Sequence, residues 1–178
     1  MKTLTEQLAQ YADYHRDPRN ILTHFIGIPM IVLAVQVLLS RPAWPLGAFV
    51  LTPALLVTLL ACLYYVALDR PLGVLMAALL AAGLALAGQI AALPTGAWLW
   101  WGIGLFVVGW AIQFVGHVYE GRKPAFVDDL VGLVIGPLFV VAKAVFALGL
   151  RRDLHTAIEQ RAGPERQRAS AGRGAALS

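Results

Sequence analysis

Long apolar runs separated by short polar segments dominate the chain. Four of them, at residues 18–39, 46–68, 72–93 and 97–119, are long enough to span a bilayer core as helices, which takes roughly 20 residues. Proline-containing segments such as Asp69-Arg70-Pro71 separate the runs. The pattern predicts an all-α, polytopic integral membrane bundle with four transmembrane helices.

The residues before the first run predict a short amphipathic helix over positions 3–14. Thr3 and Glu6 have the spacing of a capping box at its start. The segment is too polar to cross a bilayer, so we expect it to lie on the membrane surface. Asp17 and Pro18 then suit the N-cap and first position of the first spanning helix.

A fifth apolar run, at residues 130–150, is unusual for a membrane span. Gly136-Pro137 interrupts it, Lys143 lies within it, and arginines follow it. We therefore predict a broken, re-entrant or interfacial segment. Together these elements predict one membrane-embedded catalytic domain over residues 1–150, followed by a basic, disordered tail over residues 151–178.

Composition and charge set the class of protein and its orientation. Apolar residues make up 59% of the chain and charged residues only 13%, whereas soluble domains are about half apolar and a quarter charged. With four crossings, most basic residues outside the tail share the tail's side and only Arg41 lies opposite; they are Arg16, Arg19, Arg70, Arg122 and Lys123. The positive-inside rule then predicts cytoplasmic termini, in a bacterial inner membrane. Stacked aromatics and nucleic-acid motifs do not accompany the basic tail, so we expect no nucleic-acid partner.

Three histidines lie where the predicted spans meet water. His15 and His24 flank the start of the first span, and His117 lies near the end of the fourth. The four-span topology brings all three to the cytoplasmic face. Imidazole is the commonest metal ligand in proteins, so the sequence predicts a metal site there. A single histidine at a helix end can also serve as an interfacial anchor, and His155 lies in a solvated segment that favours this simpler role.

Further polar residues share helix faces with these histidines. Gln113, His117 and Glu120 follow one another at steps of four and three, and Asn20 precedes His24 by four. Polar groups at membrane depth are costly and are usually functional. The fourth run also carries glycines at positions 102, 109 and 116, a stripe that suits close helix packing within one chain or between chains of an oligomer.

The strings around the histidines resemble the 2-hydroxy fatty acid dioxygenase family, whose founding members are fungal proteins of the endoplasmic reticulum. The resemblance covers about residues 5–148 and rests on three strings and the later Gly136-Pro137-Leu138-Phe139. The strings are Tyr14-His15-Arg16-Asp17-Pro18-Arg19-Asn20, Thr23-His24-Phe25-Ile26-Gly27-Ile28-Pro29, and Gln113-Phe114-Val115-Gly116-His117 with Glu120-Gly121-Arg122-Lys123-Pro124-Ala125. The tail from Arg151 lies outside it.

This resemblance implies an Fe(II)-dependent dioxygenase of fatty-acid α-oxidation. Such an enzyme uses O2 to cleave a 2-hydroxy fatty acid and releases a fatty acid one carbon shorter. The resemblance makes His15, His24 and His117 the expected iron ligands. Glu120 is then expected as a fourth ligand or as a partner that orients a histidine. Asn20, Gln113 and Tyr14 are candidate hydrogen-bonding residues near the site, and Arg122 and Lys123 are candidates to bind the substrate carboxylate.

Two other classes remain compatible with the residues. One is a different membrane metalloenzyme acting on lipid, such as a hydroxylase or hydrolase with zinc or two metals. The other is a non-enzymatic transporter or scaffold. Transporters often carry internal repeats and charges near the middle of the membrane, and the sequence has no clear example of either.

Overall fold

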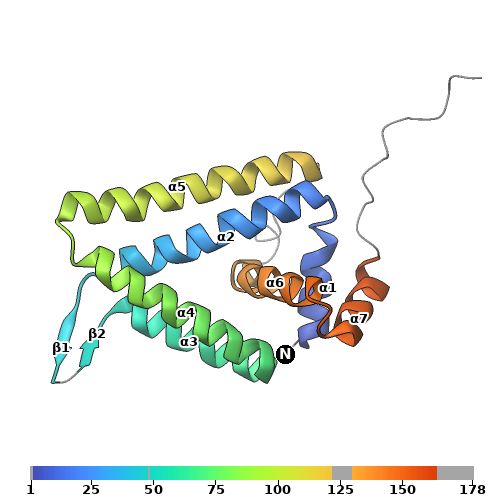
Figure 1. Cartoon of the computed structure of the whole chain (residues 1–178), viewed down its shortest axis with the longest axis horizontal. Coiled ribbons are helices and arrows are strands. Elements are labelled where there is room, and N and C mark those ends of the chain that lie inside the picture. The colour runs from blue at the N-terminus through green and yellow to red at the C-terminus, as the bar shows by residue number, and fades with distance from the viewer. Residues whose placement is uncertain (1, 48, 122–129, 164–178) are drawn as a thin grey trace, which may run out of the picture.

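The computed structural model describes residues 2–47, 49–121 and 130–163, and these are mostly helical. In chain order the elements are α1 (Leu4–Asp13), α2 (Pro18–Leu39), β1 (Trp44–Leu46), β2 (Phe49–Leu51), α3 (Pro53–Leu68), α4 (Arg70–Ala91), α5 (Thr95–Glu120), α6 (Val131–Ala147) and α7 (Arg152–Ala162). Helices α2 and α5 form one pair and α3 and α4 another (Figure 1). Helix α6 lies between the pairs, and α1 and α7 pack together at one end.

The predicted N-terminal caps are confirmed. Thr3 accepts a hydrogen bond from the backbone N–H of Glu6, and the Glu6 carboxylate accepts one from the N–H of Thr3. Asp17 caps α2, with Pro18 in its first turn. These local bonds satisfy N–H groups that a helix start leaves without partners. They explain why both starts were predictable from short sequence signals.

The glycine stripe of α5 packs against α2 within the same chain. A Cβ on Gly109 would lie 2.8 Å from Cγ1 of Ile31 and 3.0 Å from the carbonyl oxygen of Gly27. A Cβ on Gly116 would collide with the side chains of Thr23 and Asn20. The missing side chains therefore let two antiparallel helices approach closely. This packing places the start of α2 beside the end of α5.

The second predicted span differs at its start. The helix was predicted from residue 46, but β1 and β2 form a two-stranded antiparallel hairpin that ends at Leu51, and α3 begins only at Pro53. Pro45 within β1 cannot donate to a helical ladder, whereas Thr52 and Pro53 provide an N-cap and a first helical residue. The hairpin shortens this apolar helix to 16 residues.

The predicted broken fifth segment is present, but the break lies elsewhere. Helix α6 continues through Gly136 and Pro137, and the chain turns by 119° between α6 and α7. Arg151 adopts a left-handed conformation at this turn, and its guanidinium binds the Asp69 carboxylate at 2.7 Å. Residues 152–162, assigned to the tail from sequence, form α7, because the buried Ile158 belongs to the hydrophobic core. The tail expected from residue 164 onward lies outside the described residues.

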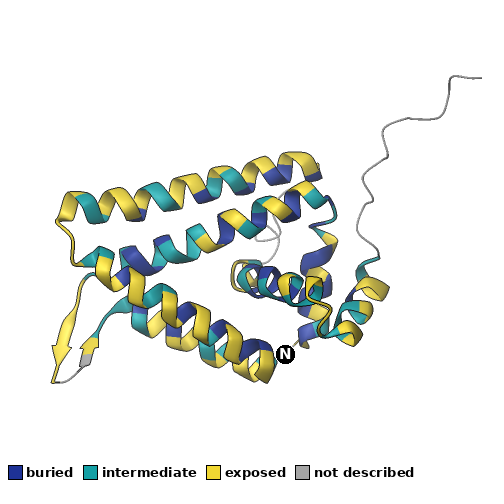
Figure 2. Cartoon of the chain, in the orientation of Figure 1, coloured by how far each residue is buried: buried dark blue, intermediate teal, exposed yellow. Residues whose placement is uncertain are grey.

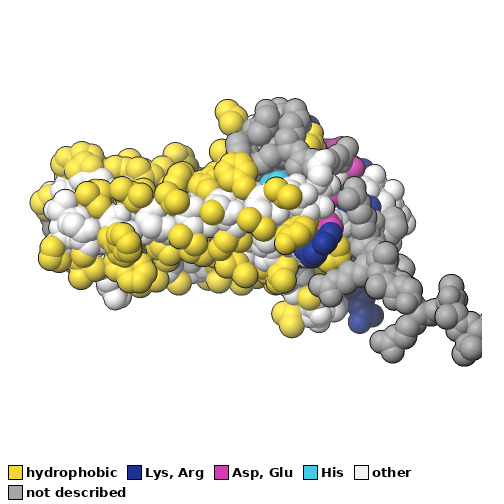
Figure 3. All heavy atoms as spheres, turned by 90° about the horizontal axis from the view of Figure 1, so that it is seen from above, with side chains coloured by type: hydrophobic (Ala, Val, Ile, Leu, Met, Phe, Trp, Pro, Cys, Tyr) yellow, Lys and Arg dark blue, Asp and Glu magenta, His cyan; other side chains and the backbone are white. Residues whose placement is uncertain are grey.

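The exterior is strongly apolar along most of the molecule. Within the described residues, α2, α4 and α5 are long and apolar enough to cross a membrane, and α6 with α7 adds a fourth if the bent pair counts as one span. Exposed positions cover the outer faces of α4 and α5 (Figure 2). On the face in Figure 3, hydrophobic side chains cover the long body and the charged ones gather at one end. This distribution suits a bilayer around the body and water at that end.

Replacing Gly109 by alanine should destabilise the bundle. The added methyl group would press on the backbone of α2, and such overpacking costs about 1–3 kcal/mol. Gly104→Ala on the same helix is the matched control, because a Cβ there meets nothing within 4 Å. Thermal unfolding in detergent should show a lower midpoint for Gly109→Ala than for Gly104→Ala. Equal midpoints would contradict the close α2–α5 contact.

Candidate metal centre

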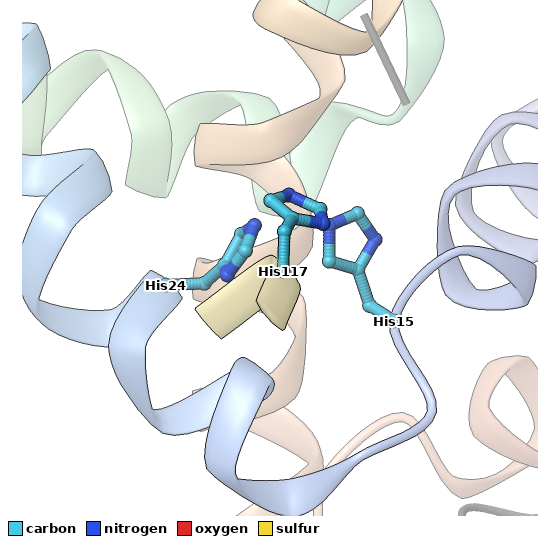
Figure 4. Close-up of side chains that lie close together, drawn as sticks. All are labelled: His15, His24 and His117. Carbon is cyan, nitrogen blue, oxygen red and sulfur yellow. The ribbon is translucent and has the colours of Figure 1, made fainter. Parts of the chain in front are cut away.

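Three imidazoles converge near the start of α2. One ligand nitrogen from each of His15, His24 and His117 lies within 4.8 Å of the other two. The ring centroids of His15 and His24 are 4.3 Å apart, and each lies 5.2 Å from that of His117. Figure 4 shows the three rings turned toward one another, from the α1–α2 connection, α2 and α5. The sequence prediction that these histidines meet is therefore correct.

Backbone hydrogen bonds fix the orientation of two of the rings. Nδ1 of His15 lies 2.7 Å from the carbonyl oxygen of Tyr11, and Nδ1 of His24 lies 2.8 Å from that of Asn20. A carbonyl can only accept, so each Nδ1 carries the hydrogen and each Nε2 keeps its lone pair. Metal-binding histidines commonly have this arrangement, in which a second contact fixes the tautomer.

The cluster is buried, and this favours neutral imidazoles. All three side chains are buried, with His15 only 1% exposed. Burial, together with the nearby His24 and His117 rings, holds the pKa of His15 well below its usual value, although its bond to Tyr11 opposes the shift. Among the described residues, Nε2 of His15 has no hydrogen-bond partner. A buried nitrogen lone pair without a donor is costly in an apolar interior, and a bound cation would satisfy it.

Glu120 holds the α1–α2 connection against the end of α5. Its Oε2 accepts hydrogen bonds from the backbone N–H groups of Arg16 and Asp17, at 2.9 and 2.8 Å. The amide nitrogen of Asn20 donates to the same oxygen at 3.0 Å. The backbone carbonyl oxygen of Asn20 in turn accepts a hydrogen bond from Nδ1 of His24. Glu120 is not in the group of converging metal-binding side chains, so its position suits orientation of the histidines.

A pocket of about 470 Å³, including its open mouth, adjoins the histidines. His24 and His117 line it together with Gln113 and residues of α6. The Gln113 side chain is buried, and neither its amide oxygen nor its nitrogen has a hydrogen-bond partner among the described residues. The pocket therefore places two of the three imidazoles beside an amide that has no hydrogen-bond partner among the described residues.

Tyr11 is a site residue that the sequence analysis missed. Its ring stacks on His15 with centroids 4.2 Å apart and an interplanar angle of 8°, and it also lines the pocket. The sequence predicted only that positions 3–14, which include Tyr11, form an amphipathic surface helix. Only the fold reveals that this helix covers the metal site, because no spacing rule links Tyr11 to His117.

Tyr14, which was predicted to lie near the site, lies outside the histidine cluster, as does His155. Tyr14 ends α1 and packs against the hydrophobic core, away from the lining of the pocket. His155 lies on α7, where its ring stacks on Phe146 and its Nε2 is 3.5 Å from Glu159. Arg122 and Lys123 lie outside the described residues, so their predicted role in carboxylate binding stays a prediction.

Chemically, the cluster provides a face of three neutral nitrogen donors. Iron, copper and zinc all accept imidazole, and three protein ligands leave positions open for small molecules. The donor set alone does not select among these metals.

Comparison with known proteins agrees with the residue pattern. Residues 1–148 match the model of a family described as 2-hydroxy-palmitic acid dioxygenase Mpo1-like. The chain is also similar to the 2-hydroxy-palmitic acid dioxygenase MPO1 of Saccharomyces cerevisiae, with 35% identity over 159 residues that cover 88% of this chain and 87% of the yeast protein. No solved structure gives a significant match. Because both similarities extend over most of the chain and its histidines, this protein belongs to the Mpo1-like family.

Proposed function

We propose that this protein is an Fe(II)-dependent dioxygenase that cleaves 2-hydroxy fatty acids and releases fatty acids one carbon shorter. The observation that carries the proposal is the convergence of His15, His24 and His117 in one buried cluster, with His24 and His117 also lining the adjoining pocket. Its family membership and the name of its yeast relative support a 2-hydroxy fatty acid as substrate and O2 as co-substrate.

The three histidines would hold the iron. The buried Nε2 of His15 needs a positively charged or hydrogen-donating partner, and the neutral rings match the donor preference of Fe(II). When bound, iron would supply the redox chemistry that a reaction with O2 requires. Glu120 and Asn20 act as positioning residues. Glu120 holds the peptide segment that follows His15 and binds the Asn20 side chain, and the backbone carbonyl of Asn20 orients the His24 ring.

Pocket residues would orient the polar end of the substrate. The Gln113 amide can donate to a carboxylate or accept from the 2-hydroxyl group, and both its polar atoms are available for this role. Tyr11, stacked on His15, closes one side of the site and restricts access of water. Holding the head group in one orientation selects the bond next to the carboxyl group for cleavage.

We also propose that the protein lies in a bacterial inner membrane with its termini and site on the cytoplasmic side. The charged side chains of α1, α7 and the start of α2 lie at the same end as the histidines, and exposed apolar side chains cover the helices beyond them. Residues 1–150 would then form a single catalytic domain. Its lipid substrate could reach the site from the membrane.

Removing the histidines tests the metal and the reaction together. We expect near-stoichiometric iron in anaerobically purified protein in detergent, and oxygen uptake with formation of the shortened acid on adding 2-hydroxypalmitate. His24→Ala and His117→Ala should lose both iron and activity, since each removes one of three donors. His155→Ala, on α7, is the control and should retain both iron and activity.

Two kinds of outcome would contradict the proposal. Bound zinc or two metals, or turnover without O2, would favour another metalloenzyme, and absence of any transition metal would contradict a metal-dependent reaction.

Replacing Glu120 by glutamine tests whether Glu120 orients the histidines or binds the metal itself. The substitution removes the charge that strengthens three hydrogen bonds, and loss of such supporting contacts typically weakens metal binding about 10–100-fold. We therefore expect weaker Co(II) binding with visible absorption bands at unchanged wavelengths. Glu159→Gln, an exposed carboxylate on α7, is the matched control. A shifted Co(II) spectrum would instead identify Glu120 as a fourth ligand.

A further inference from the structure

An apolar groove between α2, α4 and α6 adjoins the pocket beside the histidines. The groove has a volume of about 930 Å³ including its open side. Ile28, Val32 and Pro137 line both spaces, so the pocket and the groove meet at these three residues. The remaining walls of the groove are almost wholly aliphatic, with Met76 and Leu79 on one side and Val140 on the other.

One face of α2 runs along both spaces. His24, Ile28, Val32 and Gln36 follow one another at steps of four residues, so they lie along one side of the helix. Gln36 follows His24 by twelve positions, which corresponds to a rise of about 18 Å along the helix. An extended palmitoyl chain is of similar length.

Among the α2 residues that line the groove, Gln36 lies farthest along the helix from His24, and its polar side chain is fixed. The amide nitrogen of Gln36 donates to the carbonyl of Leu80 at 2.9 Å and to the hydroxyl of Thr58 at 3.2 Å. Gly83 lies so close that a Cβ there would be 2.5 Å from Oε1 of Gln36. These contacts hold the amide in place, and its polarity makes it unfavourable for a methyl group to move past it.

The open side of the groove faces the apolar exterior. Leu79 and Leu86 of α4 line the groove and are 50% and 45% exposed. They belong to a helix long and apolar enough to cross a membrane. An acyl chain could therefore enter sideways from the bilayer without passing through water.

We propose that the groove binds the acyl chain of a 2-hydroxy fatty acid, with the head group at the histidines and the methyl end at Gln36. This inference rests on the function proposed above. Three observations support this occupant: lining residues shared with the pocket beside the histidines, an apolar lining and a length that matches a long acyl chain. Gln36 and Gly83 thus set the upper limit of chain length.

Filling the groove from α4 should shift the chain-length preference. Ala82 lines the groove and is exposed, so Ala82→Phe can narrow it without replacing a buried core residue. Losing part of an apolar contact alters discrimination by roughly 10-fold or more. We expect kcat/KM for 2-hydroxypalmitate to fall on the order of tenfold relative to 2-hydroxyoctanoate, with unchanged iron content. Ala81→Phe, at the next exposed position and outside the groove, should behave as wild type, and equal effects of both variants would overturn the proposal.

A crosslinking measurement keeps this test independent of turnover. The probe is 2-hydroxypalmitate with a photoreactive diazirine at its methyl end, added to the purified full-length protein. Peptide mapping should place the crosslink near Gln36 and Gly83, and Ala82→Phe should reduce it while Ala81→Phe should not. Crosslinking near Gln36 and Gly83 without dioxygenase turnover would contradict the proposed function but would still support the groove as a binding site for the acyl chain. Crosslinking elsewhere, or competition by phospholipid but not by unlabelled 2-hydroxypalmitate, would overturn the groove as a substrate site.

Discussion

The contact between the Glu120 carboxylate and the start of α2 determines most of the site. A carboxylate near a helix N-terminus meets N–H groups that have no partner within the helix, and the helix dipole adds to the attraction. Here Oε2 accepts from the N–H groups of Arg16 and Asp17 and from the Asn20 amide. This single atom joins the end of α5 to the peptide that carries His15 and to the helix that carries His24. Of the three imidazoles, His15 depends on this atom most directly, because it lies on the α1–α2 connection that Glu120 holds.

The glycine stripe makes that contact geometrically possible. The Glu120 side chain reaches Asn20 only because Gly116, one turn earlier on α5, leaves space for the Asn20 and Thr23 side chains. Gly109 and Gly27 permit the same close approach further along the helices. Packing and polar chemistry are therefore coupled: small residues set the separation of the helices, and that separation allows the hydrogen bonds that orient the ligands.

Local sequence signals predicted the helix starts correctly, and long-range contacts explain the predictions that were wrong or missed. The starts of α1 and α2 followed from Thr3, Glu6, Asp17 and Pro18, because capping depends on neighbours in sequence. The meeting of the histidines followed from their common membrane boundary. The role of Tyr11 did not, because it depends on how α1 folds over His15. The helix at residues 152–162 was missed because burial of Ile158 against the core is absent from the local pattern. The prediction that Gly136-Pro137 interrupts the fifth run was wrong, because packing on both sides holds α6 continuous through Pro137.

Because the histidine site and the groove both lie along α2, the length of this helix would fix how long an acyl chain the proposed enzyme accepts. His24 and Gln36 belong to one uninterrupted helix, whose start is held by Glu120 and whose length is packed against α5. The distance between the metal site and the end of the groove is consequently set by helical rise, since a helix lengthens only by adding residues. Recognition is then divided between the two ends of the substrate. In the proposed enzyme, a bound metal and the Gln113 amide would select a 2-hydroxy carboxylate, and the aliphatic walls would accept a chain up to the length that Gln36 allows. A membrane protein suits this division, because the apolar tail never has to leave a hydrocarbon environment while its head group reaches the boundary with water.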